Sequence, residues 1–209
     1  MNLLSNKFPT KELQMRDAAH HMHPFTAQAE LGEKGARVIT RANGVFVYDS
    51  EGEEILDAMA GLWCVNIGYG RHELAEVAAR QMKELSYYNT FFQTTHVPAI
   101  ELAEKLAELA PFDLNHVFFA SSGSEANDTN IRLVRHYWAL KGKLNKSVII
   151  SRKNAYHGSS VGSGSLGGMS AMHDQGGMPI PDIHHINQPN WWSEGGELSP
   201  EDFGLACAR

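Results

Sequence analysis

Residues 115–128 combine side-chain types and spacings that could bind an anion. A short apolar run, residues 116–120, predicts a buried strand, and the residues after Asp128 are apolar at helical spacing. Between them lie Ser122, Gly123 and Ser124, which are small. A strand, a small-residue turn and a helix aim free backbone N–H groups and the positive end of a helix dipole at an anion. These three residues therefore predict a phosphate cradle.

The same residues have a second interpretation. Ser122 and Glu125 have the spacing of a capping box, in which a serine and an acid three residues later satisfy the free N–H groups of a helix start. Such caps are common. The stretch by itself leaves both interpretations open.

A second polar stretch follows the next apolar run. Residues 147–151 predict a strand, so the chain reads as a β-α-β unit with two parallel strands. The Ser122–Ser124 turn and residues 154–157 then follow the carboxyl ends of these strands and share the sheet edge where α/β sheets bind ligands. Tyr156 and His157 would offer an aromatic face and an imidazole at that edge.

Two other sequence patterns resemble known kinds of site, but we predict neither a metal site nor a dinucleotide site from them. His20, His21 and His23 could in principle bind a metal, but His20 and His21 point to different sides of a helix or strand, and we expect no cysteine or acidic ligand nearby. We therefore predict no metal site. Residues 162–167 spell G-x-G-x-x-G, but they lie well beyond the strand and precede no long helix, so we predict a flexible, close-packing glycine loop.

Composition limits the class of protein. The chain has 209 residues, 43% of them hydrophobic, and a formal net charge of −6 with no basic face, which argues against nucleic acid as a partner. No apolar run has the length of a membrane span, the start does not resemble a signal peptide, and two cysteines make no disulfide framework. We expect a soluble, cytoplasmic protein without membrane partners.

The remaining segments of the sequence predict further strands, loops and helices. Residues 37–57 predict a three-strand meander with a type I′ turn at Asn43-Gly44. Residues 60–70, which include Trp63, predict a loop or irregular strand, and residues 87–92 form an aromatic cluster between two predicted helices, 72–85 and 97–110. Residues 199–209 begin a well-capped helix that is short, so we expect that the sequence is truncated.

Several blocks in order resemble one family, the class III (ω-type) aminotransferases that depend on pyridoxal phosphate. The similarity is greatest to the branch that acts on amines or ω-amino acids with pyruvate. It covers nearly the whole chain and is carried by the segments HHMHPF, DAMAGLWCVNIGYG, YYNTFFQTTH, FFASSGSEAND, NAYHGSS and SLGGM. The resemblance implies an α/β fold: the N-terminal part of the fold-type I transferases, a parallel-rich sheet with flanking helices, preceded by a small antiparallel meander.

The resemblance also implies roles and boundaries. Residues 1–70 would be a helix and meander of the small domain, and residues 71–209 the N-terminal part of the cofactor-binding large domain. The cofactor phosphate would lie on Ser122, Gly123 and Ser124, and Tyr156 would stack on the pyridine ring with His157 beside it.

For the substrate, the resemblance places Trp63, Phe91 and Phe92 in the pocket, the two phenylalanines partly in the site of the other subunit of a homodimer. The Schiff-base lysine of the family would lie downstream of these 209 residues, so the chain would hold no catalytic residue and half of a site. The substrates would be an amine donor and a keto acid. A non-catalytic truncated relative, a diamine transaminase and a racemase on the same scaffold remain alternatives.

Overall fold

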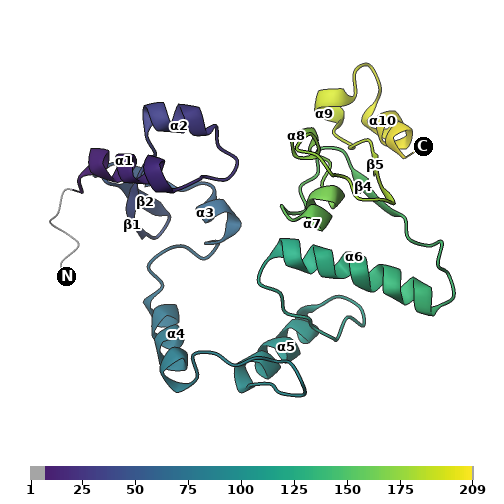
Figure 1. Cartoon of the computed structure of the whole chain (residues 1–209), viewed down its shortest axis with the longest axis horizontal. Helices are drawn as coiled ribbons and strands as arrows, with labels where there is room; N and C mark the ends of the chain where they lie inside the picture. Colours follow the sequence, from purple (N-terminus) through teal and green to yellow (C-terminus); the bar gives the residue numbers. More distant parts are fainter. Residues whose placement is uncertain (1–7, 209) are drawn as a thin grey trace. The chain divides into compact units, whose positions relative to one another are not determined.

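The structure, a computed structural model, describes residues 8–208. The chain forms two compact units, Met1–His96 and Val97–Arg209 (Figure 1). The boundary between these units lies beyond residue 70, where the family resemblance places its domain boundary. The assignment of residues 1–70 and 71–209 to domains of a whole enzyme stays a prediction.

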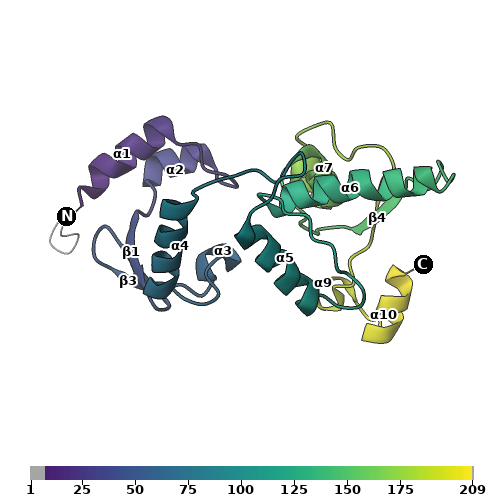
Figure 2. The same ribbon diagram turned by 90° about the horizontal axis from the view of Figure 1, so that it is seen from below.

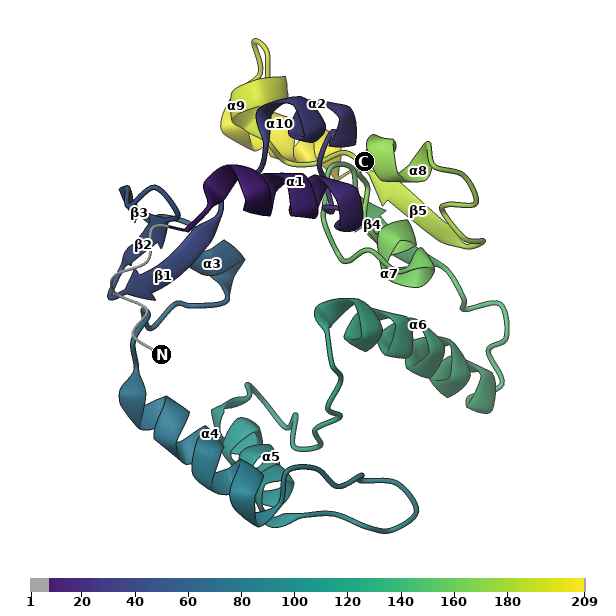
Figure 3. The same ribbon diagram turned by 60° about the vertical axis from the view of Figure 1, so that its left-hand side comes forward.

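The first unit begins with two helices and a small antiparallel sheet (Figure 3). The helices are α1 (Thr10–His20) and α2 (Gln28–Lys34). The strands are β1 (Ile39–Asn43), β2 (Phe46–Asp49) and β3 (Glu54–Leu56), in the order β1-β2-β3. The predicted meander is confirmed.

The turn between β1 and β2 differs from the predicted type. Asn43 pairs with Phe46, so the two loop residues are Gly44 and Val45. A type I′ turn needs a positive φ at both loop residues, and of the two only Gly44 has one, at 58°. The prediction of a type I′ turn was wrong because this register places β-branched Val45 where a positive φ is strongly disfavoured.

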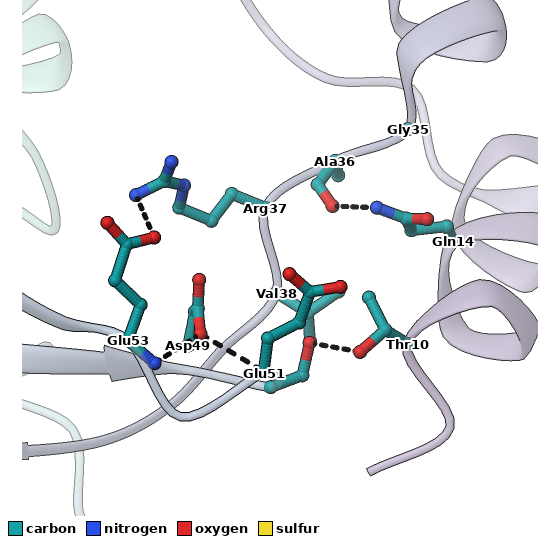
Figure 4. Close-up of a pocket in the computed structure, with 10 residues that line it drawn as sticks. Thr10, Gln14, Gly35, Ala36, Arg37, Val38, Asp49, Glu51 and Glu53 are labelled. Atoms are coloured by element: carbon teal, nitrogen blue, oxygen red, sulfur yellow. Dashed lines mark hydrogen bonds and ion pairs between the residues drawn. The ribbon is translucent and has the colours of Figure 1, made fainter.

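Helix α1 is joined to the sheet through a small polar pocket (Figure 4). The Thr10 and Ser50 hydroxyls lie 2.8 Å apart, and Gln14 Nε2 donates to the Ala36 carbonyl at 2.9 Å. Asp49 Oδ1 accepts the N–H groups of two residues of the following turn, Glu51 and Glu53. The polar groups of this pocket therefore pair with one another and fix the helix to the turn.

Two further helices complete the first unit. The short segment α3 (Ala60–Trp63) is irregular, and α4 (His72–Glu84) matches the helix predicted over residues 72–85. Gly44 and Tyr69 form an isolated antiparallel bridge that joins the loop between α3 and α4 to the β1–β2 turn.

The second unit contains a parallel strand pair and several helices. Its long helices are α5 (Val97–Leu109) and α6 (Gly123–Leu140), and its strands are β4 (Ile149–Arg152) and β5 (Ile183–Ile186). The short helices are α7 (Val161–Leu166), α8 (Ser170–His173), α9 (Trp191–Glu194) and α10 (Pro200–Cys207). Helix α7 packs against β4 and beside α6 (Figure 2). Ser199 caps α10 through Asp202 N at 3.1 Å, as its sequence predicts.

The strand predicted at residues 116–120 is not formed. β4 pairs in parallel with β5, and residues 116–120 are neither helix nor strand. Phe118 is 70% exposed instead of buried. A strand exists only when a neighbour accepts and donates its backbone hydrogen bonds, and no described segment pairs with residues 116–120. The β-α-β unit predicted for residues 116–151 was therefore wrong, although β4 itself was predicted correctly.

Residues 162–167 were predicted as a loop, and most of them lie in helix α7. Ser160 caps the helix with a capping box: its side chain accepts from Ser163 N, and Ser163 Oγ accepts from Ser160 N. This box satisfies the first N–H groups and stabilises a helix that its glycines disfavour. Close packing was predicted correctly, because a Cβ on Gly164 would lie 2.9 Å from Met178 Sδ.

No helix in residues 8–208 is long and apolar enough to cross a membrane.

Candidate functional site

The start of helix α6 is both capped and able to bind an anion. Ser122 Oγ accepts from Glu125 N at 3.2 Å, and the Glu125 carboxylate accepts from Ser121 N at 2.8 Å. These bonds leave the N–H groups of Gly123 and Ser124 without an acceptor in the helix, as at any helix start. The two interpretations of this stretch are therefore compatible: the cap orders the turn, and two donors remain.

The loop after β4 reaches this helix start, as the sequence predicts. Ser124 Oγ accepts from the Ser159 backbone N–H at 3.1 Å, and Asn127 Nδ2 donates to the His157 carbonyl at 2.7 Å. Both bonds join residues at least thirty positions apart in the chain. The convergence of the two stretches does not depend on a strand at residues 116–120, because the contact is made by α6 itself.

Gly158 sits at the point of closest approach between the two stretches. Its φ is 133°, and a Cβ added there would lie 2.5 Å from Ser124 Oγ and 2.3 Å from Ser163 Oγ. Ser163 is fully buried, and its hydroxyl lies 2.7 Å from Ser160 Oγ. Gly158 therefore lies between the Ser124 hydroxyl at the α6 start and the buried Ser163 hydroxyl of helix α7.

The donor set of this corner fits a phosphate. The oxygens of Ser122 and Ser124 already accept backbone N–H groups. Each hydroxyl therefore keeps its hydrogen to donate. With the N–H groups of Gly123 and Ser124, the corner offers four donors beside the positive end of an 18-residue helix. This is the chemistry that a phosphate monoester needs.

Tyr156 and His157 belong to the loop that meets α6. The Tyr156 ring is 57% exposed, and the backbone of His157 is fixed by the bond from Asn127. Along the chain, both residues lie within three positions of Ser159, whose backbone N–H donates to Ser124. Stacking of Tyr156 on a cofactor ring stays a prediction.

Trp63 ends a turn with an unusual backbone. Ala60, Gly61, Leu62 and Trp63 all have positive φ values, between 49° and 63°. The left-handed region costs about 1–2 kcal/mol for each residue other than glycine. The Trp63 side chain is 77% exposed, so its own packing does not offset this cost. Backbone strain of this kind is typical of residues that are held for a function.

The turn is held by Asp57 and Tyr69. Asp57 Oδ2 accepts from Gly61 N and from the Tyr69 hydroxyl, both at 2.7 Å. The hydrogen bond from Tyr69 lowers the pKa of Asp57, helped by backbone N–H groups, and burial opposes this shift. The same bond to the carboxylate raises the pKa of Tyr69. The pair therefore stays in its bonded form, carboxylate and neutral phenol, over the neutral pH range.

Phe91 and Phe92 form an exposed aromatic pair in the first unit. Their ring centroids are 5.9 Å apart, and the side chains are 66% and 95% exposed. The backbone is shaped by Asn89, whose Oδ1 accepts from Phe91 N at 2.9 Å. The predicted roles of Trp63, Phe91 and Phe92 in a substrate pocket stay predictions.

The histidine cluster has an acidic partner that the sequence argument overlooked. Asp17 Oδ1 lies 3.0 Å from His21 Nδ1, and Asp17 Oδ2 lies 2.8 Å from His23 Nε2. The expectation of no acidic group nearby was wrong, because the end of α1 turns back over its last turn. One ligand atom from each residue lies within 4.8 Å of the others, so this triad could hold a divalent cation. The distances are equally those of ordinary hydrogen bonds, which lower the pKa of Asp17.

A family profile, aminotransferase class-III, matches residues 28–198. The chain belongs to this family. The predicted family and the predicted fold class, that of the fold-type I transaminases, are confirmed.

Relatives in the class-III aminotransferase family match nearly all of the chain. A putrescine–pyruvate aminotransferase of Pseudomonas aeruginosa is 58% identical over 209 residues, which is 100% of this chain and 46% of the relative. A diaminobutyrate–2-oxoglutarate transaminase of Halomonas elongata is 39% identical over 95% of this chain and 43% of its own length. The chain thus spans about half the length of the curated relatives it matches.

Solved structures of transaminases also resemble this chain in fold. A thermostable (S)-enantioselective omega-transaminase from Thermomicrobium roseum superposes with a TM-score of 0.89 at 43% identity, covering 94% of this chain and 44% of that one. An omega transaminase from Pseudomonas jessenii, in complex with PMP, superposes with a TM-score of 0.90 at 38% identity over the same shares of the two chains.

Sequence reasoning missed several residues around these sites. Asn127 and Ser159 join the two stretches of the anion corner, Ser163 packs against Gly158, and Asp57 and Tyr69 hold the Trp63 turn. Their polar types were visible in the sequence. Their partners were not, because the bonds are set by tertiary contact and not by spacing.

Proposed function

We propose that the whole protein is a pyridoxal-phosphate-dependent transaminase that moves an amino group from a primary amine to pyruvate or a similar keto acid. The observation that carries this proposal is the four-donor corner at the start of α6, closed by the bond from Ser159 to Ser124. Membership of the class-III aminotransferases supports it.

In this proposal the corner binds the cofactor phosphate. The N–H groups of Gly123 and Ser124 and the hydroxyls of Ser122 and Ser124 donate to the phosphate oxygens. The Tyr156 ring stacks against the cofactor ring, and His157 lies beside it. When bound, pyridoxal phosphate supplies the electron sink for carbanion chemistry. The residues of this corner orient the cofactor.

We further propose that the amine donor is an aliphatic diamine or an ω-amino acid. The 58% identical relative is a putrescine–pyruvate aminotransferase, which favours a diamine over the racemase alternative. Trp63, Phe91 and Phe92 are proposed to line the donor pocket, and the exposure of the two phenylalanines fits a contribution across a homodimer.

The test is an assay of the whole protein. It should retain a chromophoric cofactor after dialysis, form alanine from pyruvate with putrescine as donor, and elute as a dimer. Cofactor binding without amine-dependent alanine formation would favour another reaction on the same scaffold. If the protein neither binds cofactor nor forms alanine, it is a non-catalytic relative.

The anion corner can be tested separately from turnover. Ser124→Asp places a carboxylate against the proposed phosphate and should abolish cofactor retention, whereas Ser193→Asp, at an exposed position in α9, should leave it unchanged. Normal retention by Ser124→Asp would place the phosphate elsewhere.

A further inference from the structure

The Trp63 turn is strained, and nothing in its own packing explains the strain. Four successive residues have positive φ, three of them with a Cβ. The side chains at its end, Leu62 and Trp63, are 62% and 77% exposed. A chain free to relax would leave this conformation, so other groups must hold it.

Backbone hydrogen bonds close the turn, from Trp63 N to the Met59 carbonyl at 2.9 Å and from Cys64 N to the Ala60 carbonyl at 3.0 Å, and one carboxylate adds a side-chain bond from inside it. Asp57 precedes the turn, and its Oδ2 accepts the Gly61 N–H at 2.7 Å. Gly61 is the second of the four left-handed residues, so this bond acts at the centre of the turn. The same oxygen accepts a hydrogen bond from the Tyr69 hydroxyl at 2.7 Å, and this second bond holds the carboxylate in position.

Tyr69 connects the turn to the sheet. Its backbone N–H donates to the Gly44 carbonyl at 2.8 Å, and its carbonyl accepts from Gly44 N at 3.3 Å. Tyr69 is therefore fixed to the β1–β2 hairpin through its backbone and to Asp57 through its hydroxyl.

The Tyr69 hydroxyl also packs against the turn directly. A Cβ on Gly61 would lie 3.1 Å from Tyr69 Oη and 2.8 Å from Val65 Cγ2. The turn is thus enclosed on the side of Tyr69 and Val65, while Trp63 stays exposed. The result is a continuous path of contacts from the sheet, through Tyr69 and Asp57, to the backbone that carries the indole.

We propose that Asp57 and Tyr69 are positioning residues that hold the indole of Trp63 in place and so set the size of amine donor that the enzyme accepts. This inference rests on the proposed function of Trp63. It goes further by assigning the control of donor size to two residues that act through Trp63. Releasing Tyr69 from Asp57 would let the turn relax and the indole move, which makes room for a bulkier donor.

Hydrogen exchange of the Gly61 amide tests the hold without any turnover. Tyr69→Phe should speed exchange at Gly61 by about ten- to 150-fold, the factor for losing one hydrogen bond to a charged group. Tyr48→Phe is the matched control, because the Tyr48 hydroxyl also donates to a carboxylate, that of Glu54 at 2.5 Å, on a neighbouring pair of strands. This control should leave the exchange at Gly61 unchanged.

Donor selectivity tests the consequence in the whole protein. The measured quantity is the ratio of kcat/KM for 1-phenylethylamine, which has a ring on the amine-bearing carbon, to kcat/KM for putrescine. Trp63→Ala should raise this ratio most, and Tyr69→Phe should raise it about fivefold, mainly through KM of the bulky donor. In a Trp63→Ala background, Tyr69→Phe should have no further effect, because it acts only through the indole.

Asp57→Asn is the second variant, since its amide oxygen can still accept from Gly61. It should shift the ratio less than Asp57→Ala does. If Trp63→Ala leaves the ratio unchanged, the proposed role of Trp63 fails. If Trp63→Ala changes the ratio but Tyr69→Phe does not, or if Tyr69→Phe acts equally in both backgrounds, the positioning inference is overturned and the proposed function stands.

Discussion

Gly158→Ala is the substitution to which the anion corner should be most sensitive. The added methyl group would lie 2.3 Å from Ser163 Oγ and 2.5 Å from Ser124 Oγ, both far inside van der Waals contact. The φ of 133° is also one that residues with a Cβ rarely adopt. The substitution must therefore either strain the backbone or separate the loop from α6.

The expected loss in the free energy of unfolding is the sum of these two effects. A sparsely populated φ costs about 1–3 kcal/mol. Overpacking against two side chains adds about 1–3 kcal/mol. We expect Gly158→Ala to lower the free energy of unfolding by about 2–6 kcal/mol, with a loss of cofactor retention because Ser124 is pushed out of place.

The assay is urea denaturation followed by tryptophan fluorescence, together with retention of pyridoxal phosphate through gel filtration. Gly204→Ala in α10 is the matched control: nothing lies within 4 Å of its added Cβ, so it should stabilise the protein by about 0.5–1 kcal/mol. If Gly158→Ala is as stable as the parent and retains cofactor, the contact between the loop and α6 is not what forms the corner.

Three further predictions concern single hydrogen bonds and rings. Ser122→Ala removes the cap of α6 and should cost about 1 kcal/mol of stability, measured by urea denaturation; no change would mean that Glu125 alone caps the helix. Tyr156→Phe should retain cofactor, whereas Tyr156→Ala should weaken retention by about 0.5–1.5 kcal/mol in equilibrium dialysis, and equal losses would argue against stacking. The lowered pKa of Asp57 stabilises the fold above the ordinary carboxyl value, near pH 4, and this contribution is lost as pH falls through the folded pKa. Tyr69→Phe should raise the pKa of Asp57 in an NMR titration, and an unmoved pKa would exclude the tyrosine as its main cause.

Local elements were predictable because their signals are local. The helices over residues 72–84 and 97–109, the meander and the Ser199 cap follow from periodicity and from residues that satisfy nearby backbone groups. The family followed from several blocks in order, and the profile match confirms it.

Two errors share one cause. The run at residues 116–120 has a strand composition, but its backbone has no pairing partner among the described residues, so composition alone could not make it a strand. The turn at Gly44 was assigned to type I′ because the dipeptide Asn43-Gly44 favours it, but the strand register decided which residues stand in the loop. In both cases a neighbouring strand, which the local sequence does not contain, decided the outcome.

The sequence by itself determined the caps, the long helices, the small residues at the α6 start and the family to which they belong. Only the tertiary structure decided that Ser159 donates to Ser124, that Gly158 fills the space between two serines, and that Asp57 and Tyr69 hold the Trp63 turn. The physical reason is the distance along the chain over which each kind of interaction acts. Helix propensity and capping act within about four residues along the chain, whereas these contacts join segments whose meeting depends on how the whole unit packs.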